Sequence, residues 1–153
     1  MIKSTKTTQE IIHNILSRDT HKVWEASCNI ISLGQDNERM KQFIPYLEDI
    51  KASTKGLNMG GLIAPNQRFI DKAIEIIEFY KKGTGCSCCL LGEDSNPRDE
   101  EKNGNMTIQN IVNVENSNYV DYYIMKCMKC NEKYKVYERE YHYFWWEWIR
   151  LIE

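Results

Sequence analysis

Five of the six cysteines fall into two tight clusters, and clustered thiols can do chemistry that scattered ones cannot. Cys86, Cys88 and Cys89 crowd into four positions, and Cys127 and Cys130 follow in the segment "KCMKCNEKY". Thiolates bind zinc in tetrahedral sites, and two close groups of cysteines separated by a long insert are typical of such sites. The spacing therefore predicts a bound metal ion. Buried apolar thiols and a redox switch are the alternatives.

A closed zinc site takes four ligands, so one of the three crowded cysteines is spare. Cys86 with Cys89 would repeat the CxxC spacing of Cys127 and Cys130. Cys86 with Cys88 would suit an extended segment, because residues two apart point to the same side of a strand. No glycine or proline follows Cys86 to make a tight turn, which favours the second pair. We therefore expect a structural Zn²⁺ held by Cys86, Cys88, Cys127 and Cys130, with the choice between Cys88 and Cys89 left open.

The rest of the sequence offers no catalytic set. The three histidines, His13, His21 and His142, lie far apart, two of them beside acidic residues on expected helices. A Gly-rich phosphate loop, an HExxH motif and a nucleophile elbow are all absent from the sequence. Four protein ligands on a zinc ion would leave no place for an activated water. We expect a protein that is not an enzyme, and keep a metal-dependent or thiol enzyme as the third hypothesis.

Charge and hydropathy narrow the class of partner. The net charge of −2 is a poor match for a dedicated nucleic-acid binder. Residues 1–83 hold 12 basic and 10 acidic side chains, and residues 84–153 hold 8 and 12, so the second half favours a basic partner or is simply solvated. No apolar run reaches the roughly 18 residues of a membrane span, and the N-terminus lacks the apolar region of a signal peptide. We expect a cytoplasmic protein with no membrane partner.

The first half has the apolar periodicity of amphipathic helices. Asp19 is a candidate N-cap, and Pro45 is expected to kink a helix or restart it. The stretch from Leu16 to Ile50 looks like a HEAT-type repeat, but the chain has room for two helix pairs at most, so this half must lean on the second half. Helices are expected within residues 7–18, 20–33, 37–54 and 67–82, the last capped by Asn66.

The segment "GLNMGGLIAPN", residues 56–66, interrupts the helices. Its glycines and proline forbid a continuous helix. Met59, Leu62 and Ile63 are apolar although they lie among turn residues. They either plug the helix ends or form a recognition surface, because exposed apolar loops often bind partners.

The second half has the alternation of strands. "MTIQNIVNVE", "YVDYYIMKC" and "EKYKVYERE" are expected strands, and "CSCCLLG" is expected to be a short one. The polar residues 93–105 are expected to form a mobile loop, and "YHYFWWEWIRLIE" a closing helix. The predicted fold class is therefore α+β: N-terminal HEAT-like helical hairpins over residues 1–83, then a small antiparallel zinc-ribbon-like sheet over residues 84–153, packed as one unit.

The C-terminal aromatic residues are too many for a small sheet to bury. They either fill the seam between the halves or form part of an interface, where Trp and Tyr dominate binding energy. Interleaved lysines would also allow stacking on RNA bases, but the acidic residues 93–101 and the net charge make nucleic acid an unlikely partner. The candidate partner-binding residues are Met59, Leu62, Ile63, Asp99, Glu100, Glu101 and Trp146.

Three stretches together resemble a known family: "SRDTHKVWEASCNIISLGQDNERMKQFIPYLEDI", "MGGLIAPNQRFIDKAIEIIEFYKKG" and the following "CSC". They look like the bacterial immunity proteins of contact-dependent growth inhibition and related polymorphic toxin systems. The resemblance covers about residues 16–90. It implies a small, cytosolic, non-enzymatic protein that binds one cognate toxin domain, often a nuclease, and neutralises it. The alternative is a zinc-ribbon nucleic-acid-binding or translation-associated module.

Overall fold

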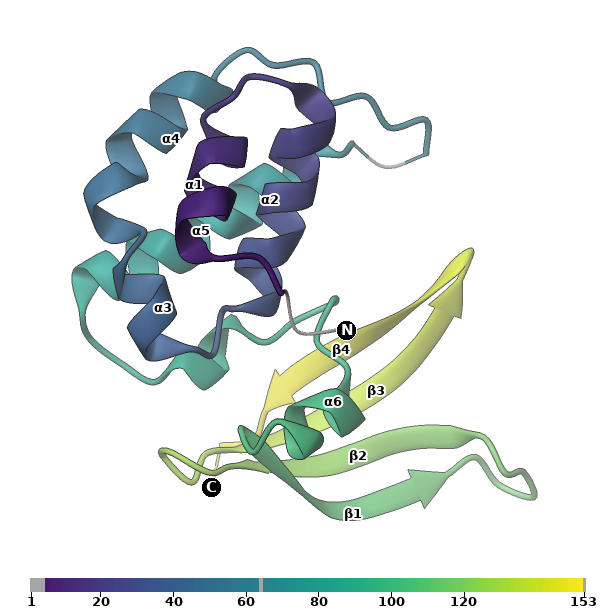
Figure 1. The fold of residues 1–153 in the computed structure, drawn as a ribbon. Helices are drawn as coiled ribbons and strands as arrows, with labels where there is room; N and C mark the ends of the chain where they lie inside the picture. Colours follow the sequence, from purple (N-terminus) through teal and green to yellow (C-terminus); the bar gives the residue numbers. More distant parts are fainter. Residues whose placement is uncertain (1–4, 64, 153) are drawn as a thin grey trace. The chain divides into compact units, whose positions relative to one another are not determined.

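The computed structural model describes residues 5–63 and 65–152 and divides into two compact units, one ending at Gly85 and the other beginning at Cys86 (Figure 1). The first unit holds the helices α1 to α5, and the second holds a four-stranded antiparallel sheet. The α+β class and the order of helices before sheet are confirmed. Over the described residues, no helix combines the length and the apolar character that crossing a bilayer requires.

Side-chain caps begin the first two helices, and the cap at Asp19 was predicted from the sequence. The Thr7 hydroxyl accepts the Glu10 N–H while Glu10 accepts the Thr7 N–H, and Asp19 accepts the N–H groups of His21 and Lys22. Pro45 restarts the chain in a 3₁₀ turn rather than kinking one long helix. The elements are α1 (Thr8–Ile15), α2 (Thr20–Ser32), α3 (Asn37–Lys41), η1 (Ile44–Tyr46), α4 (Leu47–Thr54) and α5 (Gln67–Lys82).

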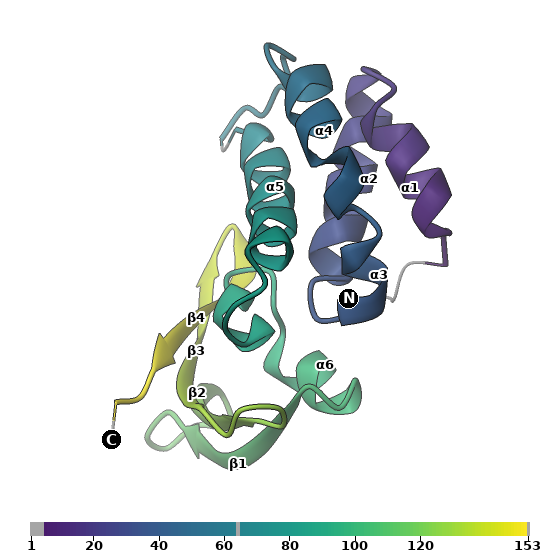
Figure 2. The same ribbon diagram turned by 90° about the vertical axis from the view of Figure 1, so that its left-hand side faces the viewer.

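Apolar faces of these helices form the core of the first unit. α2 packs against both α1 and α5, and the helices lie side by side in two views (Figures 1 and 2). The Tyr80 hydroxyl donates to the Gly34 carbonyl at 2.8 Å and so ties α5 to the turn after α2. The fully buried side chains include Ile11, Ile15, Val23, Ile30, Phe43, Ile50, Ile70 and Ile77.

The second unit is an antiparallel meander with the strand order β1-β2-β3-β4. β4 occupies the segment that we expected to form a closing helix, so that expectation was wrong. Aromatic and β-branched side chains favour a pleated surface, and β3 offers β4 a full row of backbone partners. The strands are β1 (Met106–Asn113), β2 (Val120–Cys127), β3 (Lys133–Tyr141) and β4 (Tyr143–Arg150).

The expected mobile loop of residues 93–105 contains a helix, α6 (Pro97–Lys102), which corrects that prediction. Asn96 caps it by accepting the Arg98 N–H at 3.0 Å. Pro97 at the first helical position suits its fixed backbone angle. The sequence reading weighed the polar composition and missed this Asn-Pro start signal. α6 packs against β1.

The sheet has two faces of different character. The inner face is apolar and packs into a core made of Cys88, Met106, Tyr123, Met125, Cys127, Tyr134 and Val136, joined by the partly buried Trp146 and Trp148. The opposite side is here called the outer face. By strand register and alternation, it carries Tyr122, Ile124 and Lys126 on β2, Lys133, Lys135, Tyr137 and Arg139 on β3, and Tyr143, Trp145, Glu147 and Ile149 on β4.

The same substitution at two isoleucines tests the helical core. Ile30 is fully buried and Ile63 is 79% exposed. We expect Ile30→Ala to lower the free energy of unfolding by about 2–5 kcal/mol, because it removes buried methylenes and leaves a cavity. Ile63→Ala should change it by less than about 0.5 kcal/mol. Urea denaturation followed by circular dichroism measures both, and equal losses would contradict this placement of the core.

Candidate metal centre

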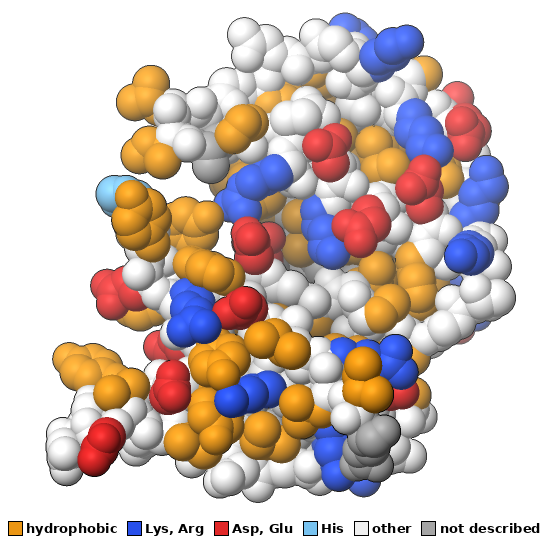
Figure 3. Space-filling model, turned by 180° about the vertical axis from the view of Figure 1, so that it is seen from behind, with side chains coloured by type: hydrophobic (Ala, Val, Ile, Leu, Met, Phe, Trp, Pro, Cys, Tyr) orange, Lys and Arg blue, Asp and Glu red, His pale blue; other side chains and the backbone are white. Residues whose placement is uncertain are grey.

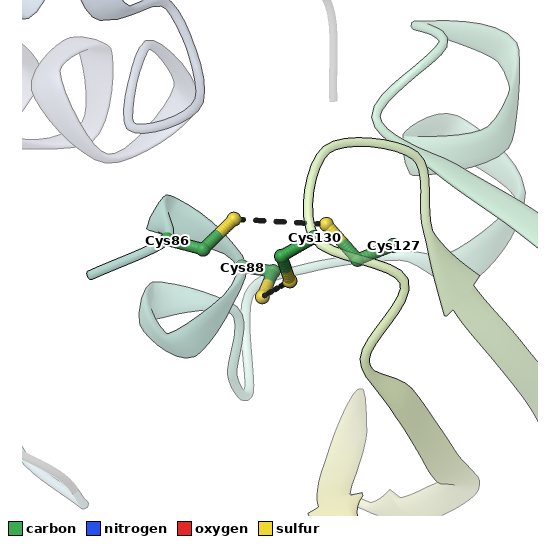
Figure 4. Close-up of side chains that lie close together, drawn as sticks. All are labelled: Cys86, Cys88, Cys127 and Cys130. Carbon is green, nitrogen blue, oxygen red and sulfur yellow. Dashed lines mark hydrogen bonds between the residues drawn. The ribbon is translucent and has the colours of Figure 1, made fainter.

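Four cysteine sulfurs converge at one end of the sheet unit (Figure 4). Cys86 Sγ lies 3.7 Å from Cys127 Sγ, and Cys88 Sγ lies 3.5 Å from Cys130 Sγ. All four sulfurs lie within 4.8 Å of one another. A tetrahedral zinc ion with Zn–S bonds of about 2.3 Å holds its sulfurs about 3.8 Å apart. The arrangement is therefore compatible with a closed four-thiolate metal site.

The first pair comes from a turn rather than from the expected strand. Cys86 has extended backbone angles, and a short 3₁₀ helix, η2 (Ser87–Leu90), follows it. The turn is closed by the Cys89 N–H, which donates to the Cys86 carbonyl at 3.2 Å. Cys88 is buried and points into the cluster, whereas Cys89 is exposed and lies outside it. The favoured pair, Cys86 and Cys88, does converge, but the strand argument that favoured it was wrong.

The second pair comes from the turn between β2 and β3. Asn131 adopts a left-handed backbone with φ of 66°, which Asn tolerates better than most residues. Its N–H donates to the Cys127 carbonyl at 3.0 Å, and the Lys129 N–H points at Cys127 Sγ at 3.4 Å. Cys127 also donates its own N–H to the Glu132 carbonyl. The turn therefore directs both sulfurs of the CxxC segment to one point.

The surroundings set the protonation of the thiols. Burial raises the pKa of Cys86 and, more strongly, that of Cys88, because a thiolate is poorly solvated there. Burial also works against the Cys127 thiolate, but hydrogen bonds from the N–H groups of Cys130 and Lys129 outweigh it and lower the pKa of Cys127. Burial therefore favours the protonated forms of Cys86 and Cys88 unless a cation replaces their protons.

One further residue contacts the cluster that the sequence reading did not single out. The Tyr134 hydroxyl lies 3.2 Å from Cys88 Sγ, and its ring packs edge-on against Trp148. Burial raises the pKa of Tyr134, so the hydroxyl keeps its proton and can donate it to a Cys88 thiolate. Such outer partners orient metal ligands. The sequence signal was the apolar alternation of Tyr134 and Val136 on β3.

A hydrogen bond to the Ser87 hydroxyl links η2 to the turn between β2 and β3. Lys129 Nζ donates to Ser87 Oγ at 3.0 Å, which holds the CxxC turn against η2. The contact places the Lys129 ammonium beside Ser87, which lies between Cys86 and Cys88 in the sequence.

The predicted partner-binding residues are divided between the two units. Met59, Leu62 and Ile63 belong to the helical unit, where Leu62 and Ile63 are strongly exposed. Glu100 accepts a hydrogen bond from the Asn105 amide, and Glu101 accepts the Ile108 N–H, so both anchor α6 to the start of β1. Asp99 lies on the same helix, and Trp146 packs against the core of the sheet unit.

Comparison of the chain with models of protein families, with curated proteins and with solved structures gave no match. The four sulfurs are the only group of three or more candidate metal ligands within the part of the chain that the structure describes. The functional argument therefore starts from the chemistry and placement of this chain's own residues.

Adjacent cysteines provide a matched test of the site. We expect Cys88→Ser to abolish stoichiometric zinc binding, because Cys88 is a buried member of the cluster. Cys89→Ser should keep one zinc per chain, because Cys89 lies outside the cluster. Metal analysis of the purified variants, with Co²⁺ substitution to count thiolate ligands, measures both. Full zinc in Cys88→Ser with loss in Cys89→Ser would reverse the assignment.

Proposed function

We propose that Cys86, Cys88, Cys127 and Cys130 bind one structural Zn²⁺. The sulfur separations and the all-thiolate donor set support this, because soft thiolates select zinc in tetrahedral sites. Four protein ligands would fill the coordination sphere. The ion then fastens η2 to the β2–β3 turn and stabilises a sheet whose own core is small.

The proposed zinc site carries a pH dependence. Burial raises the pKa of Cys86 and Cys88, so zinc must displace protons that these thiols hold tightly. Lowering the pH favours the protonated, metal-free form, and we expect zinc affinity to fall steeply between about pH 7.5 and about pH 5. A chromogenic zinc chelator reports the released metal at each pH. Affinity that does not change across this range would contradict thiolate ligation.

We propose further that the protein is a cytoplasmic immunity protein that binds and neutralises a cognate bacterial toxin domain. The observation that carries this proposal is the loop between α4 and α5. Leu62 is fully exposed and Ile63 is 79% exposed on this loop. Exposed apolar side chains that lie next to one another can mark a protein interaction site. The HEAT-like pairing of helices that we infer for this unit would serve as the frame for the loop.

Hydrogen bonds hold the base of this loop. The Asn66 N–H donates to the Gly60 carbonyl at 3.0 Å, and the Asn66 amide donates to the Met59 carbonyl at 3.1 Å. Asn66 occupies the N-cap position of α5 as predicted, but its side chain makes no capping hydrogen bond and binds the loop instead. A loop whose base is already ordered loses less conformational entropy when it binds.

The start of α5 extends the apolar surface directly after the loop. Phe69 packs edge-on against Trp24, which is 37% exposed, and the Arg68 guanidinium lies 4.4 Å from the centre of the Phe69 ring. Trp and Arg are enriched among residues that dominate binding energy at interfaces. Protein recognition is therefore the function that this surface supports.

Two exposed aliphatic residues allow a controlled test of the proposed interface. Leu62→Ser should weaken binding to the cognate toxin domain about 10- to 100-fold, since burying such a side chain contributes about 1.5–3 kcal/mol. Ile152→Ser removes a similarly exposed side chain from the other unit and should leave the affinity unchanged. Calorimetric titration against toxin domains encoded beside this gene, with growth protection in cells, measures both. Equal effects, or no binding to any such domain, would overturn the proposal.

A further inference from the structure

Basic side chains of the sheet unit gather on the outer face. Lys126 pairs with Lys133 across β2 and β3, and Lys135 and Arg139 follow on β3 at alternating positions. Glu147 is the acidic residue that β4 adds to this face, and it bonds Arg139 at 2.9 Å. Four basic residues thus meet one acidic residue here, although the whole chain has a net charge of −2.

Aromatic rings lie between these charges. Tyr122 and Tyr137 face each other across β2 and β3 with ring centres 5.6 Å apart. Lys135 Nζ lies 4.0 Å from the centre of the Tyr122 ring, and the Arg139 guanidinium lies 4.4 Å from that of Tyr137. Trp145 is the register partner of Arg139 on β4. Seen from behind, hydrophobic, basic and acidic side chains intermingle over the sheet unit (Figure 3).

The acidic segment that argued against nucleic acid belongs to the opposite side of the sheet. α6, which carries Asp99, Glu100 and Glu101, packs through Arg98 on Tyr123, an inner-face residue. Glu100 and Glu101 are also committed to hydrogen bonds near β1. The acidic residues of α6 and the basic residues of the outer face therefore lie on opposite sides of the sheet, although the net charge of the chain sums them. A nucleic-acid strand bound to the outer face would contact lysine side chains rather than these carboxylates.

We propose that the outer face of the sheet binds single-stranded nucleic acid, with Lys126, Lys133 and Lys135 contacting phosphates and with bases stacking on Tyr137 and Trp145. Four-stranded sheets with aromatic residues on one face stack two or three bases in RNA-binding domains. Base stacking and phosphate contacts together give affinity without sequence readout. This activity is separate from toxin binding, which we assign to the helical unit.

Single-stranded nucleic acid fits the face better than an acidic protein does. Lysines alone would accept either partner, because both are anionic. The tyrosine and tryptophan rings favour a partner that can stack on them. Nucleic-acid bases have a π-face that can do so, and carboxylate side chains do not. The Arg139 guanidinium carbon lies over the Tyr137 ring, and such a mixed cation and ring surface is of the kind that bases stack on.

Fluorescence anisotropy of the full chain with a labelled single-stranded RNA of about 12 nucleotides tests this proposal. The triple variant Lys126→Gln/Lys133→Gln/Lys135→Gln should reduce the steepness of the salt dependence by about 2 in log–log slope, since each single-strand phosphate contact contributes about 0.7. The matched control Lys22→Gln/Lys55→Gln/Lys102→Gln removes the same charge from other exposed surfaces and should keep the wild-type slope. Zinc content checks that both variants keep the sheet unit folded.

Tyr137→Leu separates stacking from charge. It keeps an apolar side chain on β3 and should weaken RNA binding about 5- to 150-fold with an unchanged salt slope. Three outcomes would overturn the proposal: no binding at about 50 mM salt, equal losses in the two triple variants, or equally tight binding of polyglutamate. The last would identify a surface for acidic proteins. None of these outcomes bears on toxin capture by Leu62.

Discussion

The convergence of four sulfurs is the constraint on which the sheet unit depends. Cys88 and Cys127 are both members of its core and members of the sulfur cluster, so metal chemistry and packing meet in the same side chains. Without a cation, burial keeps protons on Cys86 and Cys88. A bound cation would link η2 to the turn between β2 and β3. These two strands are the central strands of the sheet.

This fastening leaves the two faces of the sheet with different tasks. The inner face contributes Tyr134, Val136 and their neighbours to the core around the sulfur cluster. The outer face takes no part in that core and carries the lysines and rings. The helical unit has its own apolar core and presents its exposed aliphatic side chains on one hydrogen-bonded loop. The structural and binding roles that we propose therefore fall on different residues of the chain.

Local signals predicted the helical unit well and the sheet unit in part. Helix caps act within a few residues, so the predicted cap Asp19 does mark the start of a helix. Helical spacing misled at the C-terminus, because Tyr141, Trp145 and Trp148 fit a helical stripe while β4 gains a neighbouring strand that no local pattern can reveal. Polar composition hid α6 for the related reason that its stabilising contacts, with Asn105 and Ile108, lie outside the helix.

The sequence by itself determined that cysteine thiols are the candidate metal ligands, because thiol chemistry and the CxxC spacing are properties of residue type and of one tight turn. It also determined the fold class, through periodicity and capping. Only the tertiary structure decided that Cys88 joins the cluster while Cys89 stays outside, because side-chain direction in a 3₁₀ turn follows backbone angles rather than spacing. Only strand register decided that Lys126, Lys135 and Trp145 share one face. The net charge of the sequence could not show this, because it sums these residues with the acidic helix on the other side of the sheet.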